Sequence, residues 1–296
     1  MYKLGLDVGG TKINIGILDT HYQLLAVKKI YVSELNNPPL HLKNATQALC
    51  HECGIPYQDI DSCGVGIPGT VSPDGKTLIK APNISILSED FATRLENELG
   101  IPVFMMQDSR AAALGEYFCG AGIGAKTLVC ITLGTGVGAG IVIDGKVYNG
   151  ALGAAGEIGH VPVVANGRPC GCGKVGCMEK YCAGRGLDIT AQELYGADKD
   201  ASFLFSQAKQ GDTAAQKAIN HAIVLLGNTL VSMVNLLSPD CILFTGGLSE
   251  RTEEYVNPII DYIYSHCYCS GQLPKIQKAA LAEYAPLIGA ALGEKM

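Results

Sequence analysis

Short apolar runs of strand length alternate along the chain with longer stretches in which apolar residues recur at helical spacing. Phe91, Leu95 and Leu99 form one such helical stripe, and Gly100 ends it. In the first half the pattern predicts strands at Lys3–Val8, Ile13–Leu18, Leu24–Tyr31, Ser62–Ile67 and Ile101–Gln107, and helices at Leu40–Glu52, Glu89–Leu99 and Ser109–Cys119. Strands that alternate with helices predict an α/β sheet covered by helices.

The opening pattern then returns. A strand at Thr127–Leu133, a glycine turn and a strand at Gly140–Ile143 repeat the strand, turn and strand with which the chain begins. Two such units, about one domain apart, indicate a duplicated architecture. We place the boundary where glycines interrupt the pattern, which gives a first domain at 1–119 and a second at 120–285. We also expect a C-terminal helix at 286–296 that packs back on the first domain.

Helical spacing dominates from Asp212 to Leu237, and a strand at Cys241–Thr245 follows. The second part of this helical segment, from Ala222, is the most apolar stretch of the chain. Asparagines interrupt it, and the run is shorter than the roughly 20 residues of a membrane span. We therefore predict a buried helix.

Composition excludes several classes of protein. The chain has 296 residues, 48% of them apolar, and a net charge of -6 without a basic run. These values predict an ordered globular protein with no nucleic-acid or membrane partner. The N-terminus enters a strand pattern at once, without a secretory signal pattern. We expect a cytoplasmic protein.

The glycine turns are candidate phosphate loops, because glycines at a strand end let backbone N–H groups approach phosphate oxygens. At the end of the first strand, the Asp7 carboxylate would hold Mg²⁺ through water. Thr11 would add a hydroxyl and Lys12 a cation to the same phosphate loop. A plain hairpin is the alternative for each turn by itself; the recurrence of the turn favours nucleotide binding. The candidate residues are Asp7, Gly9, Gly10, Thr11 and Lys12 in the first turn, Gly134, Thr135, Gly136 and Gly138 in the second, and Gly246 and Gly247 in a third.

Three of the twelve cysteines stand apart from the rest. Cys170, Cys172 and Cys177 lie within eight residues with glycines between them, and His160 precedes them. Four nitrogen and sulfur ligands without a carboxylate favour tetrahedral zinc in a closed, structural site. Chance clustering in a cysteine-rich chain is the alternative, and the regular spacing argues against it.

Two carboxylates flank this cluster. Glu157 precedes His160 by three residues, and Glu179 follows Cys177 by two. Carboxylates in a polar, glycine-lined pocket are suited to gripping the hydroxyls of a sugar. A histidine that binds zinc through one ring nitrogen keeps the other as a donor, so His160 would serve both the metal and the sugar.

Asp108 lies at a predicted junction between a strand and a helix. It would act as a general base that deprotonates a hydroxyl for attack on a γ-phosphate. Helix capping is an equal alternative from sequence alone, and the two roles can coexist.

Together these segments resemble the ROK family of repressors, uncharacterised reading frames and sugar kinases, within the actin-like ATPase superfamily. The resemblance covers nearly the whole chain. It rests on the following motifs in order: Asp7-Val8-Gly9-Gly10-Thr11-Lys12, Leu133-Gly134-Thr135-Gly136-Val137-Gly138, Glu157-Ile158-Gly159-His160, Cys170 to Cys177 followed by Glu179, and Gly246-Gly247.

The resemblance implies a two-domain actin-like, ribonuclease H-like α/β fold with a cleft between the domains and a structural zinc loop. It implies transfer of the γ-phosphate of ATP to a hexose hydroxyl, usually O6, with Mg²⁺, in a protein that is commonly a homodimer. By motif, Asp108 is the base and zinc sits on His160, Cys170, Cys172 and Cys177. The implied sugar-site residues are Pro68, Gly69, Asn83, Gln107, Asp108, Glu157, His160 and Glu179.

The chain departs from the family pattern in two places. Gln107-Asp108-Ser109-Arg110 stands where the family has N-D-x-N, and Pro82-Asn83-Ile84-Ser85-Ile86-Leu87 stands where glucokinases have P-N-L-P-G-W. Both departures border the implied sugar pocket. A glucokinase-like enzyme is our first choice, with kinases for allose, N-acetylmannosamine or fructose as alternatives.

Two other classes of function compete with the kinase. The repressors of the family carry a DNA-binding module ahead of the first glycine loop, for which the start at Asp7 leaves no room. A non-catalytic sugar sensor would not need Asp108 or two phosphate loops. For the kinase we expect the two domains to close on the sugar and exclude water.

Overall fold

The computed structural model describes residues 1–81, 84, 86–268 and 271–293. The chain divides into two compact units. The first contains residues 1–130, 140–156 and the C-terminal segment from Ala279, and the second contains residues 131–139 and 157–278. The predicted boundary after residue 119 stays a prediction.

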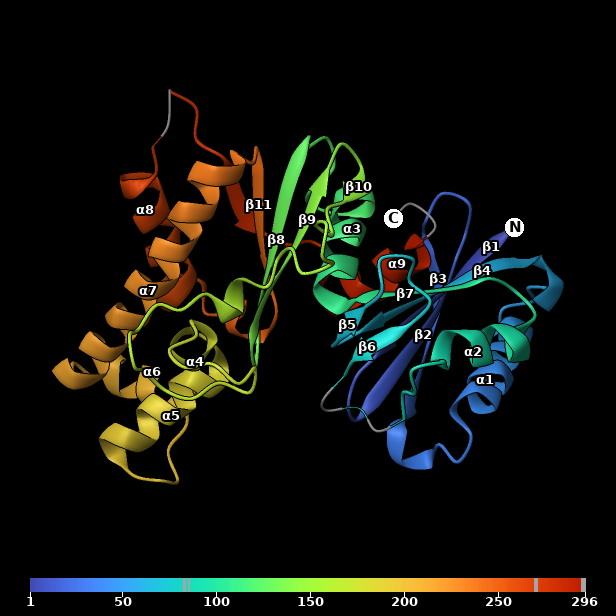
Figure 1. The fold of residues 1–296 in the computed structure, drawn as a ribbon, viewed down its shortest axis with the longest axis horizontal. Coiled ribbons are helices and arrows are strands. Elements are labelled where there is room, and N and C mark those ends of the chain that lie inside the picture. The colour runs from blue at the N-terminus through green and yellow to red at the C-terminus, as the bar shows by residue number, and fades with distance from the viewer. Residues whose placement is uncertain (82–83, 85, 269–270, 294–296) are drawn as a thin grey trace. The chain divides into compact units, whose positions relative to one another are not determined.

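The first unit contains a five-stranded sheet in the order β3-β2-β1-β4-β7 (Figure 1). Strands β1 to β3 form an antiparallel meander, and β4 and β7 add to β1 in parallel. The strands are β1 (Tyr2–Val8), β2 (Lys12–Leu18), β3 (Leu24–Tyr31), β4 (Ile60–Ile67) and β7 (Val103–Gln107). A small hairpin of β5 (Thr70–Val71) and β6 (Leu78–Lys80) lies between β4 and β7 in the sequence. Each predicted strand is present, with ends shifted by no more than two residues.

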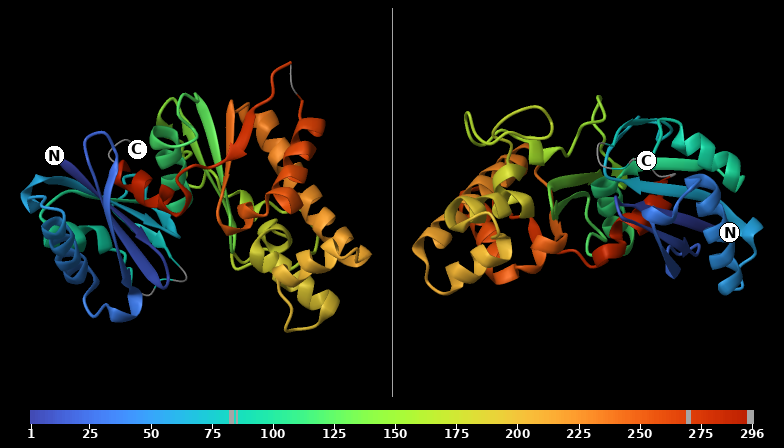
Figure 2. Two further views of the ribbon diagram at one scale, coloured as in Figure 1. Left: turned by 180° about the vertical axis from the view of Figure 1, so that it is seen from behind. Right: turned by 90° about the horizontal axis from the view of Figure 1, so that it is seen from below.

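Helices cover both faces of this sheet, as Figures 1 and 2 show. They are α1 (Pro38–Glu52), α2 (Phe91–Leu99), α3 (Asp108–Cys119) and α9 (Ala285–Ala291). Because strand side chains alternate, Leu4 and Leu6 of β1 face the core that includes residues of α1 and α2. Gly5, between them, faces α9, and a Cβ there would lie 2.3 Å from the carbonyl oxygen of Leu287. Glycines of the strands thus let α9 approach the sheet closely.

The second sheet repeats the order of the first. Its strands run β10-β9-β8-β11-β12, so that in each sheet the third, second and first strands are followed by two later ones. They are β8 (Thr127–Leu133), β9 (Val137–Ile143), β10 (Lys146–Val147), β11 (Cys241–Thr245) and β12 (Lys275–Lys278). The duplication predicted from the glycine turns is confirmed. Both turns join the first two strands of their sheets.

Five helices of the second unit complete the described fold: α4 (Glu179–Cys182), α5 (Gly184–Tyr195), α6 (Ala201–Lys209), α7 (Thr213–Leu237) and α8 (Asn257–His266). The carboxylate of Asp212 caps α7 by accepting hydrogen bonds from the N–H groups of Ala214 and Ala215. The predicted apolar run is therefore the second part of a helix of 25 residues.

Among the described residues, α7 is the one helix long and apolar enough to cross a membrane, so length does not exclude a span. In its most apolar window 56% of the residues are buried in the protein. The helix packs against α6 and α8 within the second unit, an arrangement typical of a core helix.

Candidate functional site: a cysteine–histidine clip flanked by carboxylates

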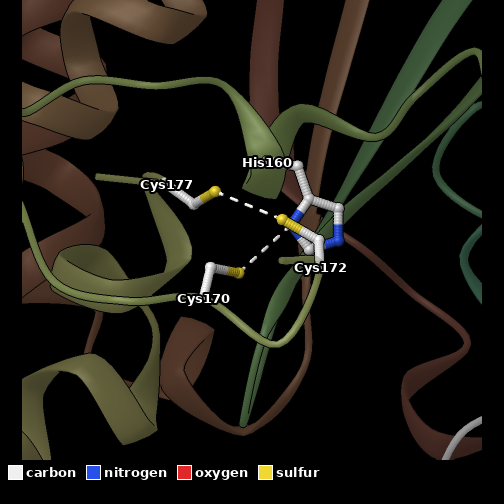
Figure 3. A group of neighbouring side chains, drawn as sticks. All are labelled: His160, Cys170, Cys172 and Cys177. Atoms are coloured by element: carbon white, nitrogen blue, oxygen red, sulfur yellow. Dashed lines mark hydrogen bonds between the residues drawn. The ribbon is translucent and has the colours of Figure 1, made fainter. Parts of the chain in front are cut away.

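The three cysteines and the histidine of the predicted zinc site come together in the second unit. One ligand atom from each of His160, Cys170, Cys172 and Cys177 lies within 4.8 Å of all the others. The Sγ atoms of Cys172 and Cys177 are 3.6 Å apart, and Cys170 Sγ is 3.6 Å from Nδ1 of His160. Figure 3 shows these side chains converging on one point.

These separations fit a tetrahedral zinc ion. With Zn–S bonds of about 2.3 Å and Zn–N bonds of about 2.0 Å, the edges of the tetrahedron are about 3.8 Å between sulfurs and about 3.6 Å between sulfur and nitrogen. The two measured distances agree with these edges. The longest separation exceeds an edge by about 1 Å, so at least one side chain would move inward on binding.

The thiols differ in acidity. Burial raises the pKa of Cys170 to about 12, and burial together with the Cys172 thiol raises that of Cys177. Although burial also acts on Cys172, hydrogen bonds from the Lys174 backbone and the neighbouring thiols lower its pKa. Cys172 is therefore the most acidic of the three thiols, and the charge of a bound ion would favour deprotonation of all three.

Glycines and short backbone bridges shape the segment from His160 to Cys177, which we call the clip. The N–H of Cys170 donates to the carbonyl of Lys174 over 2.9 Å, and Pro162 bridges to Cys177. Gly176 has a φ of +75°, and a Cβ there would lie 1.8 Å from the carbonyl oxygen of Val164. This position requires glycine, because a side chain would meet backbone and adopt a strained conformation.

Arg168, which the sequence analysis missed, anchors the clip to the helices behind it. Its guanidinium donates to the carbonyls of Lys180 and Gly186 and to the hydroxyl of Thr190, and it pairs with Glu193. It also stacks on the ring of Tyr181. A lone arginine in a glycine-rich loop gives no signal of such a role in the sequence.

The two predicted carboxylates lie on opposite sides of the imidazole. Nδ1 of His160 is 3.9 Å from Oε1 of Glu179, and Nε2 is 4.0 Å from Oε2 of Glu157. Nδ1 is the nitrogen that faces the cysteines, so Nε2 remains available as a donor. The side chains of Glu157, His160 and Glu179 are 34%, 39% and 24% exposed, which leaves them accessible to a polar ligand.

The second glycine loop adjoins these residues within the same unit. A Cβ on Gly136 would lie 3.1 Å from Oε2 of Glu179. Helix α5 begins against the loop, where the N–H of Gly184 donates to the carbonyl of Gly134. The positive end of a helix dipole there favours a negatively charged ligand.

The third glycine turn lies against the same strand end. Gly246 has a φ of +93°, and a Cβ on it would lie 2.4 Å from the carbonyl oxygen of Leu133, the residue before the second loop. Gly247 begins the short helical turn that follows. In the second loop, Thr135 lies between β8 and β9, and Gly138 is the second residue of β9. Two of the three predicted phosphate loops are thus neighbours.

In the first unit the remaining candidates follow the carboxyl ends of three adjacent strands. Asp7 pairs in register with Gly66 of β4, and Ile67 of β4 pairs with Gln107 of β7. The parallel strands therefore deliver Asp7, Pro68 and Asp108 to one edge of the sheet, where ligands of open α/β sheets bind. Gly69 follows Pro68, and a Cβ on it would lie 2.4 Å from the carbonyl oxygen of Lys80.

Asp7 is held by a neighbour that the sequence analysis missed. Asn14 pairs with it across the β1–β2 hairpin, and its Nδ2 donates to Oδ2 of Asp7 over 3.2 Å. Burial raises the pKa of Asp7, and the Asn14 hydrogen bond and the charge of Lys12 partly oppose this. Lys12 itself lies 3.6 Å from Glu283 at an exposed position. Gly9, Gly10 and Thr11 form the turn of this hairpin.

Asp108 is the first residue of α3, and Gln107 is the residue at the N-cap position. Oδ1 of Asp108 accepts the N–H of the adjacent Ser109 over 2.6 Å. The carboxylate thus occupies the first turn, where the helix dipole favours negative charge, rather than the cap position itself. Asp108 lies in the first unit, and Glu157, His160 and Glu179 lie in the second. Asn83, also predicted for the sugar site, lies outside the described residues.

Comparisons with known proteins agree with this arrangement. The model of the ROK family matches residues 3–293. A glucokinase of Halalkalibacterium halodurans is 32% identical over 94% of this chain and 88% of its own length. The N-acetylgalactosamine kinase AgaK of a Shewanella species is also 32% identical, over 97% of this chain and 95% of its own.

A solved structure is similar over almost its whole length. The ROK family glucokinase of Streptomyces griseus, in complex with glucose and AMPPNP, is 31% identical and superposes with a TM-score of 0.78, covering 98% of each chain. The family match, the relatives and this structure extend across both units. The resemblance found in the motifs is thereby confirmed, and the chain belongs to the ROK family.

Proposed function

We propose that this chain is an ATP-dependent hexose kinase, glucokinase-like, which transfers the γ-phosphate of ATP to a sugar hydroxyl, with O6 as the acceptor. The observation that carries the proposal is the grouping of Glu157, His160 and Glu179 beside a four-ligand clip. Sugar kinases at about one-third identity support it, one of them a glucokinase solved with glucose and an ATP analogue.

Sugar recognition is assigned to groups that accept and donate hydrogen bonds to hydroxyls. Glu157 and Glu179 accept from two hydroxyls, and Nε2–H of His160 donates to a third. Hydrogen bonds to charged groups contribute about 1.5–3 kcal/mol each, so the two bonds to the carboxylates account for much of the affinity of a small sugar. Pro68, Gly69, Asn83 and Gln107 border the sugar in this proposal.

Asp108 is the catalytic base. It accepts the proton of the attacking hydroxyl as that oxygen forms its bond to the γ-phosphorus and ADP leaves. Its place at the end of β7 and the start of α3 gives the carboxylate a rigid support on both sides.

Phosphate binding falls to the glycine loops. The turn at Gly9-Gly10-Thr11, the turn at Gly134-Thr135-Gly136 and the turn at Gly246-Gly247 present backbone N–H groups to the nucleotide. Asp7 holds water bound to the Mg²⁺ that accompanies ATP, and Asn14 orients its carboxylate. Mg²⁺ neutralises charge on the phosphates when bound.

His160, Cys170, Cys172 and Cys177 would hold a structural Zn²⁺, which supplies no chemical step. An ion bound at Nδ1 of His160 would fix the direction of Nε2–H. The Cys170 thiol donates to Oε1 of Glu179 over 3.1 Å, and its deprotonation on metal binding would release that carboxylate oxygen. The thiols must stay reduced to bind the ion, which favours a cytoplasmic location. The assembly we propose is a homodimer.

The sugar follows less directly from these residues. Glucose is our first choice, and allose and N-acetylmannosamine are the alternatives. Gln107, one methylene longer than the asparagine of the family pattern, changes the reach of an amide beside the base. A glucokinase and an N-acetylgalactosamine kinase are equally identical to this chain, so overall identity does not discriminate between sugars.

A coupled assay of ADP release tests the proposal. Glucose, allose, N-acetylmannosamine, fructose and N-acetylgalactosamine would each be offered at saturating Mg²⁺ and ATP. We expect sugar-dependent turnover with at least one, and the highest kcat/KM with glucose. Absence of turnover with all of them would overturn the kinase assignment, and a higher kcat/KM with another sugar would overturn only the choice of glucose.

A further inference from the structure

Arg110 is a buried cation two residues after the proposed base. It lies on α3, and only 5% of its surface is exposed. A guanidinium is costly to bury unless its donors are satisfied. The family pattern has asparagine here, a side chain too short for the same reach. The position therefore calls for an explanation specific to this chain.

The guanidinium of Arg110 holds both ends of one loop, residues 149–155, within the first unit. Nη1 donates to Oδ1 of Asn149 over 3.1 Å. Nη2 donates to the carbonyl of Gly153 over 2.7 Å and to the carbonyl of Ala155 over 3.0 Å. The planar fork of arginine suits such a set of acceptors better than the point charge of lysine.

The loop itself is built from residues that restrict the backbone little. Gly150 and Gly153 within the loop, and Gly156 directly after it, have positive φ, between 70° and 89°. Leu152, at the centre, is 93% exposed and contributes little packing. Because glycine has the greatest conformational freedom, a fixed shape for this loop depends on contacts from outside it.

The loop leads directly into the proposed sugar site. Ala155, whose carbonyl Arg110 holds, precedes Glu157 by two residues. The other end of the connection is α3, which begins with Asp108. Arg110 is thus tied through α3 to the base and through the loop to the first sugar carboxylate.

We propose that Arg110 is a positioning residue for sugar binding, which fixes the loop at residues 149–155 and through it the place of Glu157. The inference rests on the proposed function, because it takes Glu157 as a sugar ligand. Arg110 makes no contact with the sugar in this role. Its loss therefore weakens sugar binding while leaving nucleotide binding intact.

Arg110→Met and Arg110→Lys test this assignment by steady-state kinetics. For Arg110→Met we expect the KM for the sugar to rise at least tenfold, with the KM for ATP within twofold and kcat within fivefold of wild type. Arg110→Lys retains the charge and one of the contacts, so we expect an intermediate sugar KM. Arg94→Met is the matched control, because Arg94 is an exposed arginine of the same unit.

Limited proteolysis with thermolysin, which cleaves before exposed leucine, reports on the loop independently of activity. We expect cleavage at Leu152 to be about tenfold faster in Arg110→Met than in wild type, since the open loop enters the protease more readily. Asn149→Ala removes one acceptor without touching α3 and is expected to show a smaller increase. This second variant keeps the test available if Arg110→Met fails to fold.

The outcomes distinguish failure of the positioning role of Arg110 from failure of the proposed kinase function. Unchanged cleavage and an unchanged sugar KM in folded Arg110→Met would overturn the positioning role. An equal rise in the KM for sugar and for ATP would also overturn it, and would assign Arg110 to general stability. A wild-type chain without turnover on any sugar would refute the proposed function instead, while the cleavage rates would still decide whether Arg110 anchors the loop.

Discussion

The proposed role of Asp108 as a general base follows from its position at the end of a parallel strand and the start of a helix. The same position gives it a structural role, because a carboxylate in the first turn of α3 interacts favourably with the helix dipole. The two roles separate in a substitution that keeps the shape and the hydrogen-bonding oxygen but removes the basic carboxylate.

Asp108→Asn is therefore expected to lower kcat by about 10²- to 10⁴-fold, the contribution typical of a general base. The sugar KM should stay within a few-fold of wild type and the melting temperature within a few degrees, since losing the charge–dipole interaction in the first turn costs only about 0.3–1 kcal/mol. Steady-state kinetics and thermal unfolding measure both. Asp90→Asn, at the N-cap position of α2, is the control, and an unchanged kcat in Asp108→Asn would assign Asp108 to the helix alone.

Asp7 leads to a prediction about pH. Burial raises its pKa, so the folded protein takes up this proton at a higher pH than the unfolded chain does. Burying the charged carboxylate therefore costs stability above the raised pKa. The cost disappears as the pH falls toward the ordinary value of about 4.

We expect Asp7→Asn to raise the melting temperature by a few degrees at about pH 8, with the difference shrinking toward about pH 4. Turnover should fall by at least tenfold at every pH, because the neutral amide holds the Mg²⁺-bound water less strongly. Thermal unfolding across pH measures the first effect. Asp261→Asn, an exposed position on α8, should show neither, and a lower melting temperature of Asp7→Asn at about pH 8 would contradict the account.

Residues that carry their own chemical signal were predictable from the sequence. Cys170, Cys172 and Cys177 stand close together with glycines between them, and the fold brings His160 to them as expected. Arg168 and Arg110 were not predicted as supports, because their acceptors come mostly from the backbone or from distant segments. Asn14 was missed because the strand register that pairs it with Asp7 leaves no motif in the sequence. A sequence pattern names the donors of such bonds without naming their acceptors.

Among the elements, the clip is the one whose order would depend on the proposed zinc ion. Its backbone makes short bridges, such as those between Pro162 and Cys177 and between Pro169 and Val175, but no long strand or helix lies within it. A small loop of this kind gains much of its order from metal binding. Glu179, which lies two residues after Cys177 at the start of α4, would share that order.

Cys172→Ser, which removes one ligand, is therefore expected to reduce bound zinc and to raise the sugar KM at least tenfold, while the KM for ATP changes little. Zinc content by elemental analysis and the two KM values measure these effects. Cys53→Ser is the control, since Cys53 is an exposed cysteine outside the clip. An equal rise in both KM values would mean that the zinc supports the whole unit rather than the proposed sugar-binding residues.

The elements themselves divide into predictable and unpredictable ones for a physical reason. Buried strands such as β8 and β11 have the predicted ends, because apolar runs flanked by polar or glycine residues mark them clearly. Two-residue strands such as β5 and β10 have no period to detect. Helices α5 and α6 were not predicted, since α5 begins with two glycines in its first turn and α6 has only nine residues.

At the scale of the whole molecule, the repeated glycine turn was the most informative pattern. It predicted two similar halves, and each sheet indeed orders its strands in the same way. The return of the C-terminal segment to the first unit through α9 depends on glycines in β1 and β4, such as Gly64, where a Cβ would lie 1.6 Å from the carbonyl oxygen of Ala290. The sequence predicted a C-terminal helix on the first domain, but local patterns did not show that these glycines are the positions that receive it.

The central claim is that the chain moves the γ-phosphate of ATP onto O6 of a hexose, and phosphorus NMR of the reaction tests it most directly. With glucose and Mg²⁺ we predict that the γ-phosphate signal of ATP is replaced by that of a sugar phosphate ester, and that 6-deoxyglucose gives no ester. Release of inorganic phosphate alone, or no loss of ATP with glucose or any sugar of the panel, would contradict the account.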